Sequence, residues 1–182
     1  MSSEKHNIQQ LIQDYLLDEG LLRGKISDPK IEFGFQFVFP PGKDPLGRQI
    51  GRNMVVIQPK KKQLIVVSLG VQISKPHIKA LNSLEDPKKM NFFMDLRKSF
   101  LLKDVFYRID MKNHRYEITD QIFLNKDEYF SKNSFYKSIR KVFNCATYSN
   151  IILGEYCEGK IKPEDFMKSK EFTDDSNFSL YT

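Results

Sequence analysis

The stretch Ile31-Glu32-Phe33-Gly34-Phe35-Gln36-Phe37-Val38-Phe39 decides the fold class. Its odd-numbered positions are all apolar, whereas Glu32 and Gln36 are polar. A period of two places successive side chains on opposite faces of a strand. It is typical of an antiparallel sheet with one buried face and one largely wet face. We therefore predict a strand over residues 31–39 whose odd-numbered side chains, Ile31 included, share the buried face.

Four further strands are expected around this one. Two β-branched runs, at residues 54–57 and 64–71, flank a basic turn and predict a central hairpin. Residues 105–110 and 115–123 alternate apolar and polar side chains and predict a second hairpin. The residues that follow Gly20, up to the first strand, are expected to be a polar connection. The predicted sheet therefore has about five antiparallel strands.

Helical spacing of apolar residues predicts the remaining elements. A first helix begins near Ser2 or Ser3 and ends at Gly20. A second begins at Ser74, restarts at Asp86 and runs to about residue 101. Along its later part lies an apolar stripe that Arg97 interrupts. The stripe comprises Met90, Phe93, Met94, Arg97 and Leu101.

A last helix is predicted from the helical spacing of apolar residues that begins at Phe135. Residues 148–156 either continue it or form a separate segment. The fold class is then α+β, with one antiparallel sheet and helices packed on it in the order α-β-β-β-α-β-β-α. We expect one domain over residues 1–168 and a polar C-terminal tail over residues 169–182.

Composition is typical of a folded protein without a membrane span. The chain of 182 residues has 15 Phe, 8 Tyr and no Trp, with 40% hydrophobic residues. Its 29 basic and 23 acidic residues give a net charge of +6, which attracts polyanions only weakly because the two signs are interspersed. Two cysteines cannot form a disulfide framework, and the N-terminus lacks an apolar signal core. These features predict a cytoplasmic protein.

The predicted order of elements, over residues 4 to about 157, resembles the type III secretion chaperone-like fold. The runs 31–39, 54–58, 64–74 and 92–97 also resemble an uncharacterised archaeal family of unknown function. The first resemblance implies a homodimer that binds extended polypeptide through apolar grooves. It rests on topology and therefore assigns no functional residue.

The loop after the first strand carries Gly42 and Lys43, but it does not fit a phosphate-binding loop. Such a loop needs a Ser or Thr after the lysine and a helix directly behind it, whereas here Asp44 follows and a strand comes next. We expect no nucleotide cofactor. A plain hairpin loop is one interpretation. The other is an anion- or partner-binding flap that uses Lys43, Arg48 and Arg52.

Metal and thiol chemistry are not predicted. His6, His77 and His114 are scattered, with no pair at the spacing of two ligands on one helix face. Cys145 and Cys157 lack the spacing of a metal or redox pair. Cys145 lies on an apolar helix face and is expected to be a buried, inert thiol.

Basic residues form the remaining candidate surface. Lys137, Arg140 and Lys141 stand at helical spacing, and Lys60, Lys61 and Lys62 form the tip of the first hairpin. Together they could follow a phosphate backbone, or they could be ordinary solvated lysines.

The sequence therefore favours a non-enzymatic, chaperone-like, homodimeric protein that binds polypeptide. The alternative hypothesis is a basic accessory factor that binds RNA or a ribonucleoprotein. A small-molecule enzyme is the third hypothesis.

Overall fold

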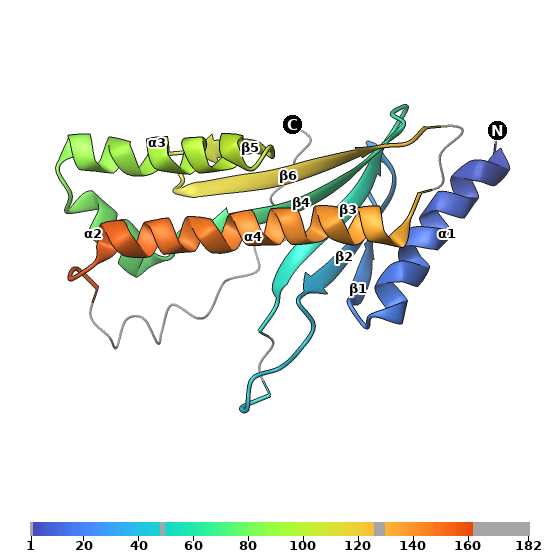
Figure 1. Ribbon diagram of the computed structural model, residues 1–182, viewed down its shortest axis with the longest axis horizontal. Coiled ribbons are helices and arrows are strands. Elements are labelled where there is room, and N and C mark those ends of the chain that lie inside the picture. The colour runs from blue at the N-terminus through green and yellow to red at the C-terminus, as the bar shows by residue number, and fades with distance from the viewer. Residues whose placement is uncertain (1, 48–49, 126–129, 162–182) are drawn as a thin grey trace. The chain divides into compact units, whose positions relative to one another are not determined.

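The computed structural model describes residues 2–47, 50–125 and 130–161, with side chains from residue 8 onward (Figure 1). Arg48 and the expected tail over residues 169–182 lie outside this part of the chain. In chain order the elements are α1 (Ser2–Asp18), β1 (Leu22–Ile26), β2 (Ile31–Phe39), β3 (Arg52–Pro59), β4 (Leu64–Gln72), α2 (Lys75–Asn82), α3 (Asp86–Leu102), β5 (Phe106–Asp110), β6 (Arg115–Phe123) and α4 (Lys132–Cys157).

The strands form one antiparallel sheet in the order β1-β2-β3-β4-β6-β5, so the predicted α+β class is confirmed. The predicted number of strands is wrong, because the described residues form six. The missed strand is β1, which pairs with β2 at the edge of the sheet. The charged residues Arg23 and Lys25 interrupt the apolar pattern by which a strand is recognised in the sequence. Charged side chains are common on edge strands because they discourage pairing with other chains.

The chain divides into two compact units. Of the described residues, unit 1 comprises 2–47, 50–69, 119–125 and 130–143, and unit 2 comprises 70–118 and 144–161. β4, β6 and α4 are each divided between the two units: one part of each element belongs to unit 1 and the other part to unit 2. The expectation of one domain over residues 1–168 stays a prediction.

The aromatic face of β2 forms the core of unit 1. Phe33, Phe35 and Phe37 are buried, whereas Glu32 and Gln36 are exposed, which confirms the period of two. α1 contacts β1 and β2. Tyr15 of α1 lies 6.3 Å, ring to ring, from Phe135 of α4, so the first turn of α4 belongs to the same core.

The opposite face of β2 is also partly buried, which the sequence did not predict. A bulge between Ile31 and Phe33 breaks the alternation, and Ile31 packs with Ile57 and Val66 in a separate cluster. Placing Ile31 with the phenylalanines is therefore wrong, because the extra residue of a bulge turns the side chain to the other face. Gly34 lies in this cluster and leaves room for the neighbouring isoleucines.

Unit 2 is built around Tyr116 of β6. Its hydroxyl lies 2.6 Å from the Ser149 hydroxyl of α4, and its ring lies 5.8 Å from that of Phe100 of α3. Ser149 is inside a helix that is continuous to Cys157. Residues 148–156 therefore continue the last helix, which decides the alternative that the sequence left open.

The predicted restart before α3 is confirmed, because α2 ends at Asn82 and α3 begins at Asp86 with a proline in its first turn. The expected stripe of α3 is not its core face. Met90, Met94 and Leu101 are exposed. The buried side chains are instead Phe92, Phe93, Leu96, Ser99 and Phe100. α3 has apolar residues on two sides, and only contact with β5 and its neighbours decides which side is buried.

Candidate functional site

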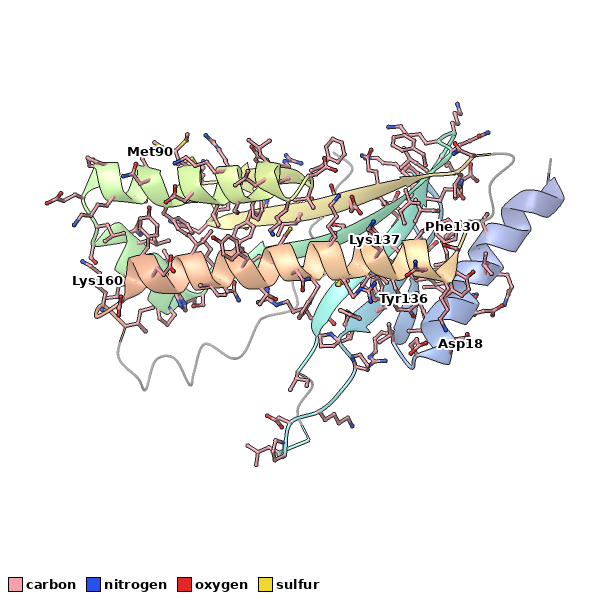
Figure 2. All side chains as sticks on the ribbon, viewed as in Figure 1. Asp18, Met90, Phe130, Tyr136, Lys137 and Lys160 are labelled. Carbon is pink, nitrogen blue, oxygen red and sulfur yellow. The ribbon has the colours of Figure 1, made fainter. Side chains whose placement is uncertain are left out.

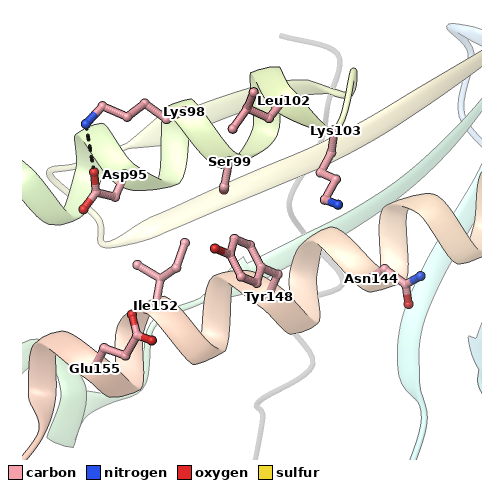
Figure 3. A pocket seen from close by; sticks show the side chains of 9 residues that line it. All are labelled: Asp95, Lys98, Ser99, Leu102, Lys103, Asn144, Tyr148, Ile152 and Glu155. Carbon is pink, nitrogen blue, oxygen red and sulfur yellow. Dashed lines mark hydrogen bonds and ion pairs between the residues drawn. The ribbon is translucent and has the colours of Figure 1, made fainter.

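An open groove of about 690 Å³ runs between α3 and the second half of α4, within unit 2 (Figure 3). Its lining residues follow helical spacing on both sides. α3 and the residue after it contribute Asp95, Lys98, Ser99, Leu102 and Lys103, and α4 contributes Asn144, Tyr148, Ile152 and Glu155. The row on α4 from Asn144 to Glu155 is about 16 Å long at the ordinary rise of an α-helix.

The middle of the groove is apolar. Leu102 is 85% exposed and Tyr148 is 47% exposed, which is unusual for side chains of this size. The buried Ile152 and Ser99 also line this part. Ser99 contributes little polarity, because its hydroxyl donates a 2.8 Å hydrogen bond to the carbonyl of Leu96. This part of the groove can hold an apolar side chain.

One end of the groove is lined by an ion pair, Asp95 with Lys98, and by the further carboxylate of Glu155. The Tyr156 hydroxyl donates a 2.7 Å hydrogen bond to the Asp95 carboxylate, and the Lys98 ammonium lies 3.1 Å from the same group. These two contacts, that of Tyr156 first, lower the pKa of Asp95. Burial raises the pKa of Tyr156 to about 12, so its phenol keeps its proton at neutral pH. The ring of Tyr156 also meets that of Phe92, which joins the two helices here.

The other end of the groove is basic. Figure 3 shows Lys103 and Asn144 at this end and Glu155 at the end that Asp95 occupies. The groove therefore has the Asp95–Lys98 ion pair and Glu155 at one end, apolar side chains in the middle and Lys103 at the other end. The sequence did not reveal this site. Its only signal was the pair Leu101-Leu102 at the end of a helix, and such a pair is usually buried.

The predicted flap is a closed loop. The Ile50 amide donates a 3.3 Å hydrogen bond to the Gly42 carbonyl, and Lys43 between the two strands is exposed. Arg52 is half-buried at the start of β3. A Cβ atom on Gly51 would lie 2.2 Å from the Pro40 carbonyl oxygen. The two backbone segments at the base of the loop are therefore too close for any residue but glycine at this position. Binding of an anion or a partner by this loop stays a prediction.

The predicted basic surface is only partly solvated. Lys60, Lys61 and Lys62 are exposed at the turn between β3 and β4, and Lys137 and Arg140 are exposed on α4. Lys141 is different, because its ammonium lies 3.0 Å from the Asp120 carboxylate in a half-buried ion pair. A carboxylate therefore neutralises one of the three cations that the sequence places together on the helix.

A smaller hollow, of about 260 Å³, lies in unit 1 beside Arg140. Its other lining residues are Glu19, Leu21, Phe39, Pro41 and Tyr136. The Tyr136 hydroxyl donates a 2.6 Å hydrogen bond to the Tyr15 carbonyl, and burial raises its pKa to about 12. Figure 2 labels Tyr136 on α4 and Asp18 on α1. Lys132 bonds to Asp18 and Glu19 at 3.3 and 2.9 Å, so this hollow is a structural junction.

The thiols and histidines form no recognisable reaction centre in the described part of the chain. Cys145 and Cys157 are free and buried, and burial raises the pKa of Cys157 to about 11. Such a thiol is a poor nucleophile at neutral pH. The Ser74 hydroxyl lies 2.7 Å from Nδ1 of His77, but this contact is at the start of α2 and lines neither hollow. Among the described side chains, no group of three His, Cys, Asp or Glu is placed to hold a metal ion.

The helices formed by the described residues include none with both the length and the hydropathy of a membrane span.

Comparisons with known proteins give the family. No curated protein matches the chain. The crystal structure of an uncharacterized protein from Methanothermobacter thermautotrophicus matches with a TM-score of 0.70 and 24% identity, over 81% of this chain and 96% of that one. This likeness shows the fold alone.

The family model described as an uncharacterized conserved protein (DUF2299) matches residues 8–153. This range contains nearly all of the lining of the α3–α4 groove and every described strand. The chain therefore belongs to the DUF2299 family of uncharacterised conserved proteins.

Proposed function

We propose that this protein is a non-enzymatic, homodimeric binding protein that holds a polypeptide segment in the α3–α4 groove. The observation that carries the proposal is the pair Leu102 and Tyr148, two large apolar side chains exposed on facing sides of one groove. Exposed apolar surface rimmed by polar groups is typical of interaction sites.

The shape of the groove favours a polypeptide over a small molecule. Small-molecule sites usually enclose most of the ligand and converge several polar groups on it. Here Leu102, which is 85% exposed, stands at the rim, and the charged groups lie apart at the two ends. An elongated segment with apolar anchors along one side matches this arrangement, as in peptides bound between helices.

The resemblance to the type III secretion chaperone-like fold supports the same proposal. That resemblance implies binding of extended polypeptide through apolar grooves. The order of elements agrees with it except for the additional strand β1 and the division of the middle helix into α2 and α3. Function depends on the site and not on the fold, so the groove itself is the site to test.

Leu102→Asp is expected to weaken peptide binding by about tenfold or more, because it places a carboxylate in the apolar middle of the groove. The probe is a fluorescein-labelled peptide with one aromatic residue flanked by lysine and aspartate, titrated by fluorescence anisotropy. Ile151→Asp is the matched control. Ile151 precedes Ile152 of the groove and is 54% exposed, but it lines neither the groove nor the seam proposed below. Its substitution should leave the affinity within about twofold.

Equal loss in both variants, or no binding by the parent protein, would contradict the proposal. A labelled single-stranded RNA serves as the second probe at two salt concentrations. RNA binding that weakens with salt, together with no peptide binding, would favour the basic accessory factor instead. The pairing of Lys141 with Asp120 leaves fewer cations for that function.

The proposed homodimer has a candidate surface on the outer side of α3. Met90, Met94, Arg97 and Leu101 follow the spacing of a heptad seam, and Met90 and Leu101 are 50% and 67% exposed. Figure 2 labels Met90 on α3. Around a two-fold axis, Met90 of one protomer faces Leu101 of the other, and Met94 faces Arg97. This pattern is self-complementary, as a two-fold interface requires.

We expect sedimentation equilibrium at micromolar concentration to give twice the chain mass of 21.4 kDa. Leu101→Asp should give the mass of one chain, because it places two carboxylates in the seam. Leu102→Asp, which lies outside the seam, should leave the dimer intact. A monomeric parent protein would refute the homodimer, although it would leave peptide binding in the groove unaffected.

A further inference from the structure

We propose that the small hollow in unit 1 binds a free apolar α-amino acid as a zwitterion, with the ligand carboxylate on Arg140 and the ligand ammonium on Glu19. The hollow shares no lining residue with the α3–α4 groove, so this inference goes beyond the proposed polypeptide binding and does not depend on it. Three observations support it: fixed apolar walls, a guanidinium without a partner, and a carboxylate that shares its cation with a second carboxylate.

The apolar walls of the hollow are held in place by contacts within unit 1. The ring of Phe39 meets that of Phe143 of α4 edge to face, with 5.4 Å between the ring centroids. The ring of Tyr136 is fixed at its far end by the hydrogen bond of its hydroxyl to α1. Leu21, which is 1% exposed, and Pro41 complete the apolar lining. Because these walls are already ordered, binding of an apolar side chain against them costs little conformational entropy.

The guanidinium of Arg140 is the free hydrogen-bond donor of the hollow. Arg140 follows Tyr136 by four residues on α4, which places both side chains on one side of the helix. No described residue forms an ion pair or a hydrogen bond with this guanidinium. The Tyr136 hydroxyl is not free to donate, because its proton bonds to the Tyr15 carbonyl. A planar guanidinium matches a carboxylate with two parallel hydrogen bonds, so the ligand carboxylate belongs here.

The carboxylate of Glu19 favours a cationic group beside that anion. Glu19 follows the last residue of α1 and lies 2.9 Å from the Lys132 ammonium, which is also 3.3 Å from the Asp18 carboxylate. One ammonium thus serves two carboxylates at a helix C-terminus, where the helix dipole favours a further positive charge. A simple anion would be repelled here. A zwitterion instead presents its ammonium to Glu19 and its carboxylate to Arg140.

The size of the hollow selects a ligand no larger than an amino acid. Its volume of about 260 Å³ is below the range of about 300–1,000 Å³ that is usual for drug-sized ligands. An α-amino acid has its ammonium and carboxylate on one carbon atom, so its side chain is left to contact the rings of Phe39 and Tyr136. Phenylalanine and leucine are representatives of this class.

Isothermal titration calorimetry of the full chain with phenylalanine tests the proposal. Three related probes each lack one feature: 3-phenylpropanoate has no ammonium, 2-phenylethylamine has no carboxylate, and glycine has no apolar side chain. Phenylalanine should bind about tenfold or more tightly than each of them, because every probe loses one charge-assisted contact or the apolar contact. Phenylalanine amide and N-acetylphenylalanine, which imitate the two ends of a polypeptide, should also bind more weakly. Equal binding of either one would overturn the assignment to a free amino acid.

Two variants test the two charged contacts separately. Arg140→Gln should weaken binding of phenylalanine about tenfold and leave that of 2-phenylethylamine within about twofold. Glu19→Gln should also weaken binding of phenylalanine but should tighten that of 3-phenylpropanoate, because it removes a like charge. Lys137→Gln is the matched control, since Lys137 is an exposed cation of the same helix that does not line the hollow (Figure 2). It should leave every affinity within about twofold.

No heat of binding at millimolar phenylalanine would overturn the proposal. So would equal losses in Arg140→Gln and Lys137→Gln, which would indicate only a general effect of net charge, or an unchanged affinity for phenylalanine in Glu19→Gln. Leu102→Asp, which alters the groove, should leave phenylalanine binding unchanged. The failure of this inference is therefore distinguishable from failure of the proposed polypeptide binding.

Discussion

Replacing Phe35 with alanine is expected to lower the free energy of unfolding by about 3–5 kcal/mol, the range for emptying the site of a buried ring. The Phe35 side chain is 0% exposed and lies 5.8 Å, ring to ring, from Phe33. It sits on β2 between β1 and β3, opposite Val56 of β3. β2 is paired on both sides, so its backbone cannot collapse into the vacated space, and the loss should lie within this range.

Urea denaturation measures this effect through the far-ultraviolet circular dichroism and through tyrosine fluorescence, which is unmasked because the chain has no Trp. Gln36→Ala is the matched control. Gln36 is the next residue of the same strand, but it is exposed, so the expected change is within about 0.5 kcal/mol. A loss below about 1 kcal/mol for Phe35→Ala would mean that β2 has a different register.

The second large effect is expected at the neighbouring position, on the opposite face of the same strand. Gly34→Val should destabilise the protein by about 2–3 kcal/mol, because it overfills a packed cluster. A Cβ atom at Gly34 would lie 3.0 Å from the Cδ1 atom of Ile31, 3.0 Å from the Cγ2 atom of Ile57 and 3.1 Å from the Cβ atom of Ile26. The two γ-methyl groups of valine reach further into the same space.

Two further variants make the Gly34 prediction specific. Gly70→Val is the control, since Gly70 is also a strand residue but has no atom within 4 Å of the position of a Cβ. It should be neutral or stabilising by up to about 1 kcal/mol. In the double variant Gly34→Val with Ile57→Ala, the losses should fall short of additivity by more than about 0.5 kcal/mol. Additive losses in the free energy of unfolding would show that the introduced valine does not clash with Ile57.

The sequence was most informative where a local pattern is enough. The strand of residues 31–39 follows from its period of two, which any strand with one buried face must have. The helix starts at Lys75 and Asp86 follow from a proline in the first turn, where no intrahelical hydrogen bond is lost. These features depend on residues that are close along the chain, so one sequence contains all the information that they need.

Features that depend on a partner strand could not be read in this way. The bulge between Ile31 and Phe33 is a property of the pairing with β3, and it moves Ile31 to the other face. β1 is recognisable as a strand because it lies along β2, where the charges of Arg23 and Lys25 are tolerated at the sheet edge. Neither signal is present in the local pattern of apolar residues.

The α+β class, the shared face of Phe33, Phe35 and Phe37 and the net positive charge all follow from the sequence alone. Which side of α3 is buried depends on packing, because the apolar residues of this helix lie on two sides and packing selects one. That selection leaves Leu101 on the outer side and Leu102 at the rim of a groove with Tyr148. The groove joins residues about fifty positions apart, and its arrangement of charged and apolar side chains exists only where two helices pack side by side.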